Sequence, residues 1–133
     1  MKYLLLIYEN EANFATITEE EGNKIFAEYM DYTKGIRKSG NYVSGEALQP
    51  VATASTVRVQ NGKTLTTDGP FAETKEVLGG ILFLEAEDLD HAVRIMSKHP
   101  GVRVGPFEIR PAEDMTEIIR HSEARRRSAG KSS

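Results

Sequence analysis

The sequence contains no cysteine, so the chain has neither disulfides nor thiolate chemistry, and we expect a reduced, cytoplasmic setting. No apolar run approaches the roughly 18 residues of a membrane span. The apolar start, residues 1–7, is too short for a signal sequence. The net charge of −3 provides no basic surface for nucleic acid. We therefore expect no membrane partner and no nucleic-acid partner.

Metal and cofactor motifs are also missing. None of the three histidines is three or four residues from another, and we place all of them on polar faces or at element ends: His91, His99 and His121. Without cysteine this pattern predicts no zinc site. The chain has no Gly-rich loop with Lys-Ser/Thr for phosphates and no Gly-x-Ser-x-Gly elbow. We therefore expect neither a metal nor a cofactor.

A length of 133 residues with 39% hydrophobic side chains supports one domain with a single core. We assign residues 1–112 to this domain and residues 113–133 to a C-terminal tail. The tail is expected to form a short helix over residues 113–127, with Met115, Ile118 and Ile119 on one side, followed by six disordered residues. Three consecutive arginines at its end, residues 125–127, are read as a solvated helix end.

Apolar periodicity predicts alternating strands and helices. Thr18 and Glu21 form a capping box that starts the first helix, and Gly40 ends it. In order, the elements are a strand at 2–8, buried on both faces, a helix from 19, strands at 42–48, 56–60, 63–67 and 77–86, a helix at 89–98 and a strand at 107–111. This order predicts an α+β, ferredoxin-like β-α-β-(β-hairpin)-β-α-β domain, with an antiparallel sheet and both helices on one face.

The dipeptide Asn61-Gly62 is a strong hairpin signal. A two-residue loop would pair Leu65 with Arg58, whereas a three-residue loop with a bulge would pair Leu65 with Val59. We favour the bulged form, because it keeps the apolar side chains on one face.

The segment between the hairpin and the next strand is the least ordinary part of the sequence. It starts with the tight-turn signal Asp68-Gly69-Pro70-Phe71 and continues with charged residues and two adjacent glycines: Glu73, Lys75, Glu76, Leu78, Gly79 and Gly80. Adjacent glycines inside a strand indicate a bulge or a close approach by another backbone or a ligand. This pattern resembles the signature of the DGPF proteins, a branch of the YCII-related family. The resemblance covers about residues 1–112.

The resemblance implies a homodimer, in which two such domains form a dimeric α/β-barrel. The sheet itself supports this expectation, because the face without helices needs a cover. Some YCII-related proteins carry a histidine on the inner side of the first helix, thought to pair with a carboxylate for acid–base chemistry. The matching place here is close to Tyr29, so that histidine is missing. Relatives of this kind are also discussed alongside extracytoplasmic-function sigma factors, which implies a regulatory partner.

Three residues are candidate catalytic groups: Asp68, Tyr29 and Glu46. Two nearby carboxylates would drive their pKa values apart and so provide an acid and a base. The candidate ligand-binding residues follow from the signature: Gly69, Pro70, Phe71, Glu73, Lys75 and Gly79.

A structural interpretation stands beside each role. Asp68 would accept backbone N–H groups of the turn, and Tyr29 would be a core residue. Lys75 would pair with Glu73 or Glu76, and Glu46 would pair with Lys75 or Arg110.

The residues leave two functions open. The first is a cofactor-free enzyme of isomerase or lyase type, acting by acid–base chemistry on a small organic molecule beside the signature loop. The alternative is a non-catalytic ligand-binding or regulatory module linked to a sigma factor. The presence of Tyr29 instead of a histidine motivates the alternative.

Overall fold

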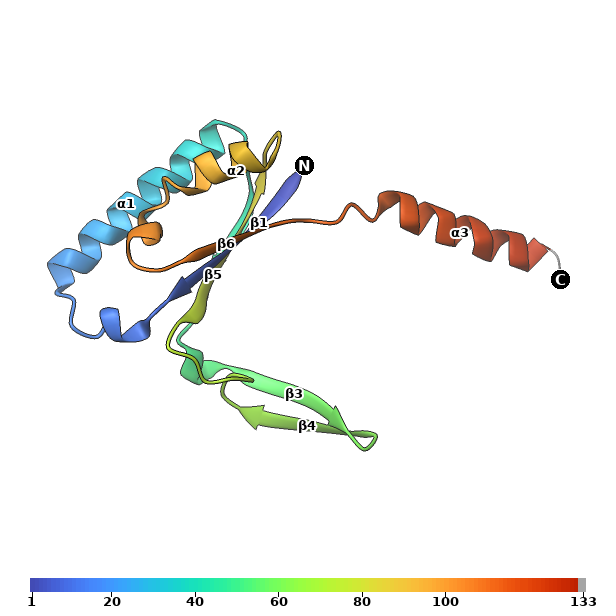
Figure 1. The fold of residues 1–133 in the computed structure, drawn as a ribbon, viewed down its shortest axis with the longest axis horizontal. Coiled ribbons are helices and arrows are strands. Elements are labelled where there is room, and N and C mark those ends of the chain that lie inside the picture. Colours follow the sequence, from blue (N-terminus) through green and yellow to red (C-terminus); the bar gives the residue numbers. More distant parts are fainter. Residues whose placement is uncertain (132–133) are drawn as a thin grey trace.

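A computed structural model describes residues 1–131 of the chain (Figure 1). A four-stranded antiparallel sheet has the order β2-β5-β1-β6, and its strands are β1 (Lys2–Glu9), β2 (Tyr42–Ala47), β5 (Val77–Glu85) and β6 (Phe107–Pro111). The helices α1 (Glu19–Lys38) and α2 (Leu89–Met96) connect these strands. This arrangement is the predicted ferredoxin-like α+β fold.

Both connecting helices lie on the same side of the sheet (Figure 1), and the core forms between them and the strands. Alternate residues of the central strands are buried there, among them Tyr3, Leu5, Leu82 and Leu84. Leu4 and Leu6, which point the other way, stay half-buried. The prediction that the first strand is buried on both faces is therefore wrong for the single chain, because helices cover only one face of its sheet.

The ends of α1 agree with the sequence signals. The Thr18 hydroxyl accepts the Glu21 N–H at 3.1 Å, and the Glu21 carboxylate accepts the Thr18 N–H at 3.4 Å. These bonds satisfy two donors at the helix start. At the other end Gly40 has φ of 80°, a conformation that suits glycine and ends the helix.

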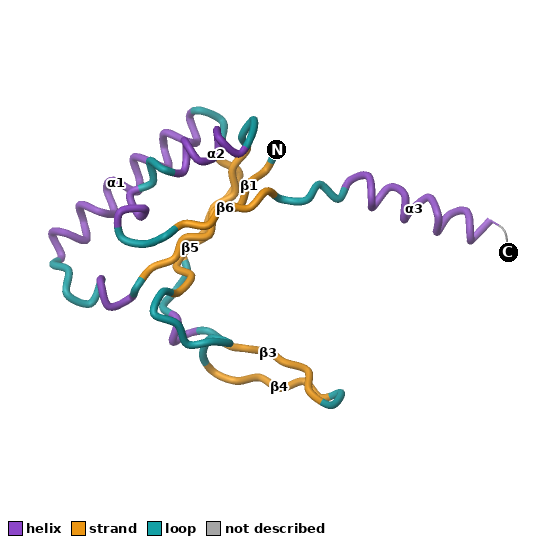
Figure 2. Tube along the Cα trace, viewed as in Figure 1, coloured by secondary structure: helices purple, strands orange, loops and turns teal. Residues whose placement is uncertain are grey.

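The inserted hairpin consists of β3 (Ser55–Gln60) and β4 (Lys63–Asp68) and forms a two-stranded sheet of its own (Figure 2). The bulged register is wrong. Gln60 pairs with Lys63 and Arg58 pairs with Leu65, so the loop has two residues. Asn61 and Gly62 adopt φ of 52° and 76°, which is the backbone that such a tight loop requires. Leu65 therefore lies on the face opposite Val57 and Val59.

The tail helix α3 (Thr116–Lys131) is longer than expected. It starts three residues later than predicted and includes four of the six residues expected to be disordered, while residues 132–133 lie outside the described part. Figure 1 shows α3 standing clear of the sheet and of the other helices. Within residues 1–131, no helix combines the length and apolar character needed to cross a membrane.

Candidate functional site

The signature loop forms the corner between the hairpin and β5. Gly69 has φ of 99° and donates its N–H to the Ala54 carbonyl at 2.7 Å, while its own carbonyl accepts the Thr56 hydroxyl at 2.8 Å. The Arg58 guanidinium donates to the Phe71 carbonyl at 3.2 Å. The turn is therefore held by main-chain groups and by side chains of β3.

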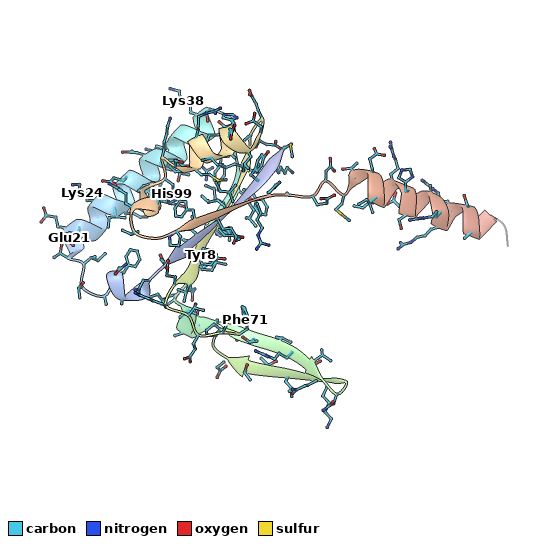
Figure 3. The ribbon with its side chains drawn as sticks, viewed as in Figure 1. Tyr8, Glu21, Lys24, Lys38, Phe71 and His99 are labelled. Carbon is cyan, nitrogen blue, oxygen red and sulfur yellow. The ribbon has the colours of Figure 1, made fainter. Side chains whose placement is uncertain are left out.

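The side-chain bonds expected for this loop do not form. Within residues 1–131, no hydrogen bond or ion pair involves the carboxylate of Asp68 or the ammonium of Lys75. Phe71 is 79% exposed. Figure 3 shows it at the hairpin, away from the helix-covered side of the sheet.

A cavity of about 750 Å³ lies on that helix-covered side. It is bounded by the first half of α1, by the adjoining ends of β1, β2 and β5, and by the loops around the short helical turns η1 (Glu11–Asn13) and η3 (Pro100–Arg103). Its walls are mostly apolar: Ile7, Phe14, Ile17, Ile25, Phe26, Tyr29, Ala47 and Val104. The volume is typical of small-molecule sites.

The cavity exists because only one end of α1 packs on the sheet. Ile36, near the end of the helix, is 7% exposed and belongs to the core. Ile25 and Phe26, in the first half, are 40% and 64% exposed. The first half of α1 therefore presents apolar side chains to the cavity instead of burying them in the core.

Of the nine sequence-predicted site residues, three line this cavity: Tyr29, Glu46 and Gly79. The other six lie outside its lining and belong to the hairpin corner: Asp68, Gly69, Pro70, Phe71, Glu73 and Lys75. Whether these six residues bind a ligand stays a prediction. The structure does not bring Asp68 and Glu46 together around this cavity.

Glu46 contributes to the cavity through its main chain. It pairs with Ile81, while the next residue, Ala47, pairs with Gly80. Gly80 lies on the helix-covered face beside Ile7, so strand alternation directs the Glu46 side chain to the uncovered face. The expected partner Arg110 is bonded to Glu108 instead.

A carboxylate that sequence reasoning did not select, Glu9, lies on the floor of the cavity. The register between β1 and β5 shifts at Ile7 and Tyr8, so Gly79 is the extra residue of a β-bulge, as the glycine pair predicted. A Cβ at Gly79 would lie 2.3 Å from the Glu9 carboxyl carbon, so only glycine leaves room for this carboxylate. Burial, and then repulsion from Glu11, raises the pKa of Glu9.

His99 closes the inner end of the cavity and is the second group that the sequence interpretation missed (Figure 3). It is 5% exposed and meets the rings of Tyr29, Tyr32 and Phe107 edge-on, at centroid distances of 5.4, 5.0 and 5.1 Å. His99 lies at an element end, as expected, since it is the N-cap of η3, but its side chain is buried. The available signal was its spacing of three from the buried Met96, which continues the inner face of α2.

The hydrogen bonds of His99 define its tautomer. Its Nδ1 accepts the Gly101 N–H at 2.9 Å, so a neutral ring carries its proton on Nε2. Burial lowers the pKa of His99 to about 4, which keeps the ring neutral at pH 7. Within the described chain Nε2 has no hydrogen-bond partner.

Tyr29 joins these groups, because it lines the cavity and contacts His99. The ring beside Tyr29 is thus that of a histidine which follows α2. The hydroxyl of the neighbouring Tyr32 already has a partner, since it donates to the Ile95 carbonyl at 3.0 Å. Burial, and then Tyr29, raises the pKa of Tyr32 to about 12. Across residues 1–131, no cluster of three or more His, Asp or Glu has the geometry of a metal site.

Comparisons with known proteins identify the family at the YCII-related level. The family model of the YCII-related domain matches residues 1–116. An uncharacterized protein of Rhizobium meliloti (strain 1021) is 29% identical over 113 residues, covering 84% of this chain and 91% of that protein. Among solved structures, 5-chloro-2-hydroxyhydroquinone dehydrochlorinase from Burkholderia phenoliruptrix AC1100, in complex with 2,5-dihydroxybenzoquinone, is similar with a TM-score of 0.49 and 13% identity. The match covers 85% of this chain and 94% of that one.

Proposed function

The chain belongs to the YCII-related family, and we propose that it is a cofactor-free enzyme that performs acid–base chemistry on a small organic molecule bound in the cavity above Glu9. One observation carries this proposal. A carboxylate with a raised pKa lies on the floor of an apolar cavity, in a space that a glycine bulge keeps open. Such a group exchanges protons near neutral pH more readily than an ordinary glutamate.

The neighbouring residues have distinct roles in this proposal. Glu9 accepts a proton from the bound molecule or returns one to it, which suits isomerisation or elimination. Tyr29 offers a hydroxyl at the same cavity, and its ring is held against His99. His99 acts through Tyr29 as a positioning residue, because its Nε2 is buried. The apolar walls provide a surface for the apolar part of the bound molecule.

The signature loop has a structural role in this proposal, and not a catalytic one. Glu11 belongs to η1 beside the cavity, and its carboxylate accepts the Val51 N–H at 3.2 Å, which ties the start of the hairpin segment to the cavity rim. We propose that the hairpin corner, including Asp68 and Lys75, positions this segment, and that the chain works as a homodimer. The apolar residues on the uncovered sheet face support the second part: Leu4, Leu6, Ile81 and Phe83.

A fragment screen tests the enzyme proposal. Neutral and charged aromatic and cyclic fragments are screened by thermal shift, and each hit is incubated with the protein and followed by proton NMR. We expect at least one hit to be converted by the parent protein, and conversion to be lost in Glu9→Gln. The matched control is Glu46→Gln, since Glu46 also borders the cavity but directs its side chain to the other sheet face.

Conversion that survives in Glu9→Gln would contradict the catalytic role of this carboxylate. Binding without conversion of any hit would leave a ligand-binding module, and the enzyme proposal would be wrong.

A further inference from the structure

The charges around the cavity are unequal. Its lining offers three acidic side chains, Glu9, Glu21 and Glu28, against two basic ones, Lys24 and Arg103, while Glu46 directs its carboxylate to the other sheet face. Arg103 is already paired with Glu28. The neutral ring of His99 adds no positive charge at pH 7. Among the described lining residues this leaves Glu9 and Glu21 against Lys24, which belongs to the exposed part of α1.

Glu9 is the acidic group without a partner. The Glu21 carboxylate accepts the Thr18 N–H in the capping box, and Glu28 holds Arg103. Within residues 1–131, the Glu9 carboxylate takes part in no ion pair and accepts no hydrogen bond. A half-buried carboxylate without a counter-charge carries a desolvation cost that a bound cation would offset.

The cavity also offers aromatic surface. Phe14, Phe26 and Tyr29 line it, and Phe26 is 64% exposed. Aromatic faces attract cations and apolar groups alike. A ligand with a positive charge at one end and an apolar body would pair with Glu9 and cover these rings.

From this combination we infer that the ligand is an organic amine, bound as an ammonium whose nitrogen faces Glu9 and whose apolar body lies along the first half of α1. This inference rests on the proposed function, because it names the ligand class of the same cavity. The proton that Glu9 exchanges is then a proton on that nitrogen, or on a carbon held beside it by the ion pair.

Three probes of nearly equal size test the inference: 2-phenylethylamine, 2-phenylethanol and phenylacetate. Binding of each is measured by isothermal titration calorimetry at pH 7.5 and low salt. We expect the amine to bind about tenfold or more tightly than the alcohol, and the acid to bind least. Glu9→Gln should remove the preference for the amine and leave alcohol binding unchanged, while Glu46→Gln should behave as the parent.

A pH series on the parent protein and on Glu9→Gln gives a second readout. The amine stays cationic at pH 7.5 and below. Its affinity should therefore fall as pH is lowered toward the raised pKa of Glu9, whereas the affinity of the alcohol should not change. The other titratable groups at or beside the cavity are Tyr8, Glu11, Glu21, Lys24, Glu28, Tyr29, Glu46, His99 and Arg103. The Glu9→Gln series separates their contribution from that of Glu9.

The outcomes distinguish the two proposals. Equal or tighter binding of the alcohol or of phenylacetate would overturn the amine inference and leave the cavity as a ligand site. An amine preference that persists in Glu9→Gln would also overturn it. If none of the probes binds at millimolar concentration, the amine inference is wrong, and the enzyme proposal then depends on the fragment screen.

Discussion

At the scale of single residues, the site depends on one missing side chain. The absence of a Cβ at Gly79 lets the Glu9 carboxylate lie on the bulge. Gly79→Ala would bring a methyl group within 2.3 Å of the Glu9 carboxyl carbon and force this side chain to move. We expect at least a tenfold loss of 2-phenylethylamine affinity with little change in the fold.

Calorimetry and circular dichroism of Gly79→Ala together check this prediction. The control is Gly35→Ala, where the added methyl group meets no atom within 4 Å. Gly35 lies inside α1, so its replacement should raise stability by up to about 1 kcal/mol and leave binding unchanged. Unchanged affinity in Gly79→Ala would show that the position of Glu9 does not matter for the ligand.

His99 gives a second prediction at this scale. Its pKa is about 4 in the folded chain and 6.5 without burial, so the unfolded chain binds the proton first as pH falls. Stability should therefore decrease from pH 6.5 to about 4 through this residue and level off below that range. His99→Phe, which keeps a ring among Tyr29, Tyr32 and Phe107, should remove this part of the slope.

Urea unfolding of the parent and of His99→Phe between pH 4 and pH 7 provides the measurement. The raised pKa of Glu9 acts in the opposite direction, because the folded chain then takes up its proton first. The difference between the two proteins cancels that contribution. Parallel stability curves would mean that His99 is not buried as a neutral ring.

At the scale of elements, local signals predicted most of the fold. The capping box at Thr18, the turn at Asn61-Gly62 and the bulge at Gly79-Gly80 all form where the sequence places them. These features depend on a few neighbouring residues, which is why sequence suffices. The hairpin register failed because we required one apolar face, whereas the two-residue turn determines the pairing.

The candidate site was less predictable because it is assembled from segments far apart in the chain. Glu9 ends β1, Tyr29 lies on α1 and His99 follows α2. No local pattern relates a strand end to a loop some ninety positions later, as between Glu9 and His99. The charged signature loop was chosen as a candidate site because its residues are consecutive in the sequence. The cavity instead depends on the distance between the first half of α1 and the sheet.

The hairpin gives the prediction at this scale. Its two strands pair only with each other and expose Val57, Val59 and Leu65. An isolated two-stranded sheet is marginal in water. We expect the amides of β3 and β4 to exchange with deuterium much faster than those of β1 and β5, measured by mass spectrometry at a dilution that favours the single chain. Equal protection would mean that another surface covers the hairpin even there.

At the scale of the whole molecule, the sheet face without helices is the surface that a single chain leaves uncovered. Leu4 and Phe83 pair across β1 and β5 on this face, and Leu6 and Ile81 pair beside them. We expect the parent protein to sediment as a dimer at about 10 µM, because burying such a face removes several apolar side chains from water. Phe83→Glu should shift it to monomer, since a charge would be buried without a partner.

The matched control is Val93→Glu, at a 42% exposed position on α2, which faces away from this sheet surface and should leave the dimer intact. A parent protein that sediments as a monomer would contradict the homodimer.

Dissociation by Phe83→Glu also tests the cavity, whose floor is formed by the same two strands on their opposite face. If amine affinity is equal in the monomeric variant, each chain holds a complete cavity; if it falls, the second copy is needed to hold the floor in place.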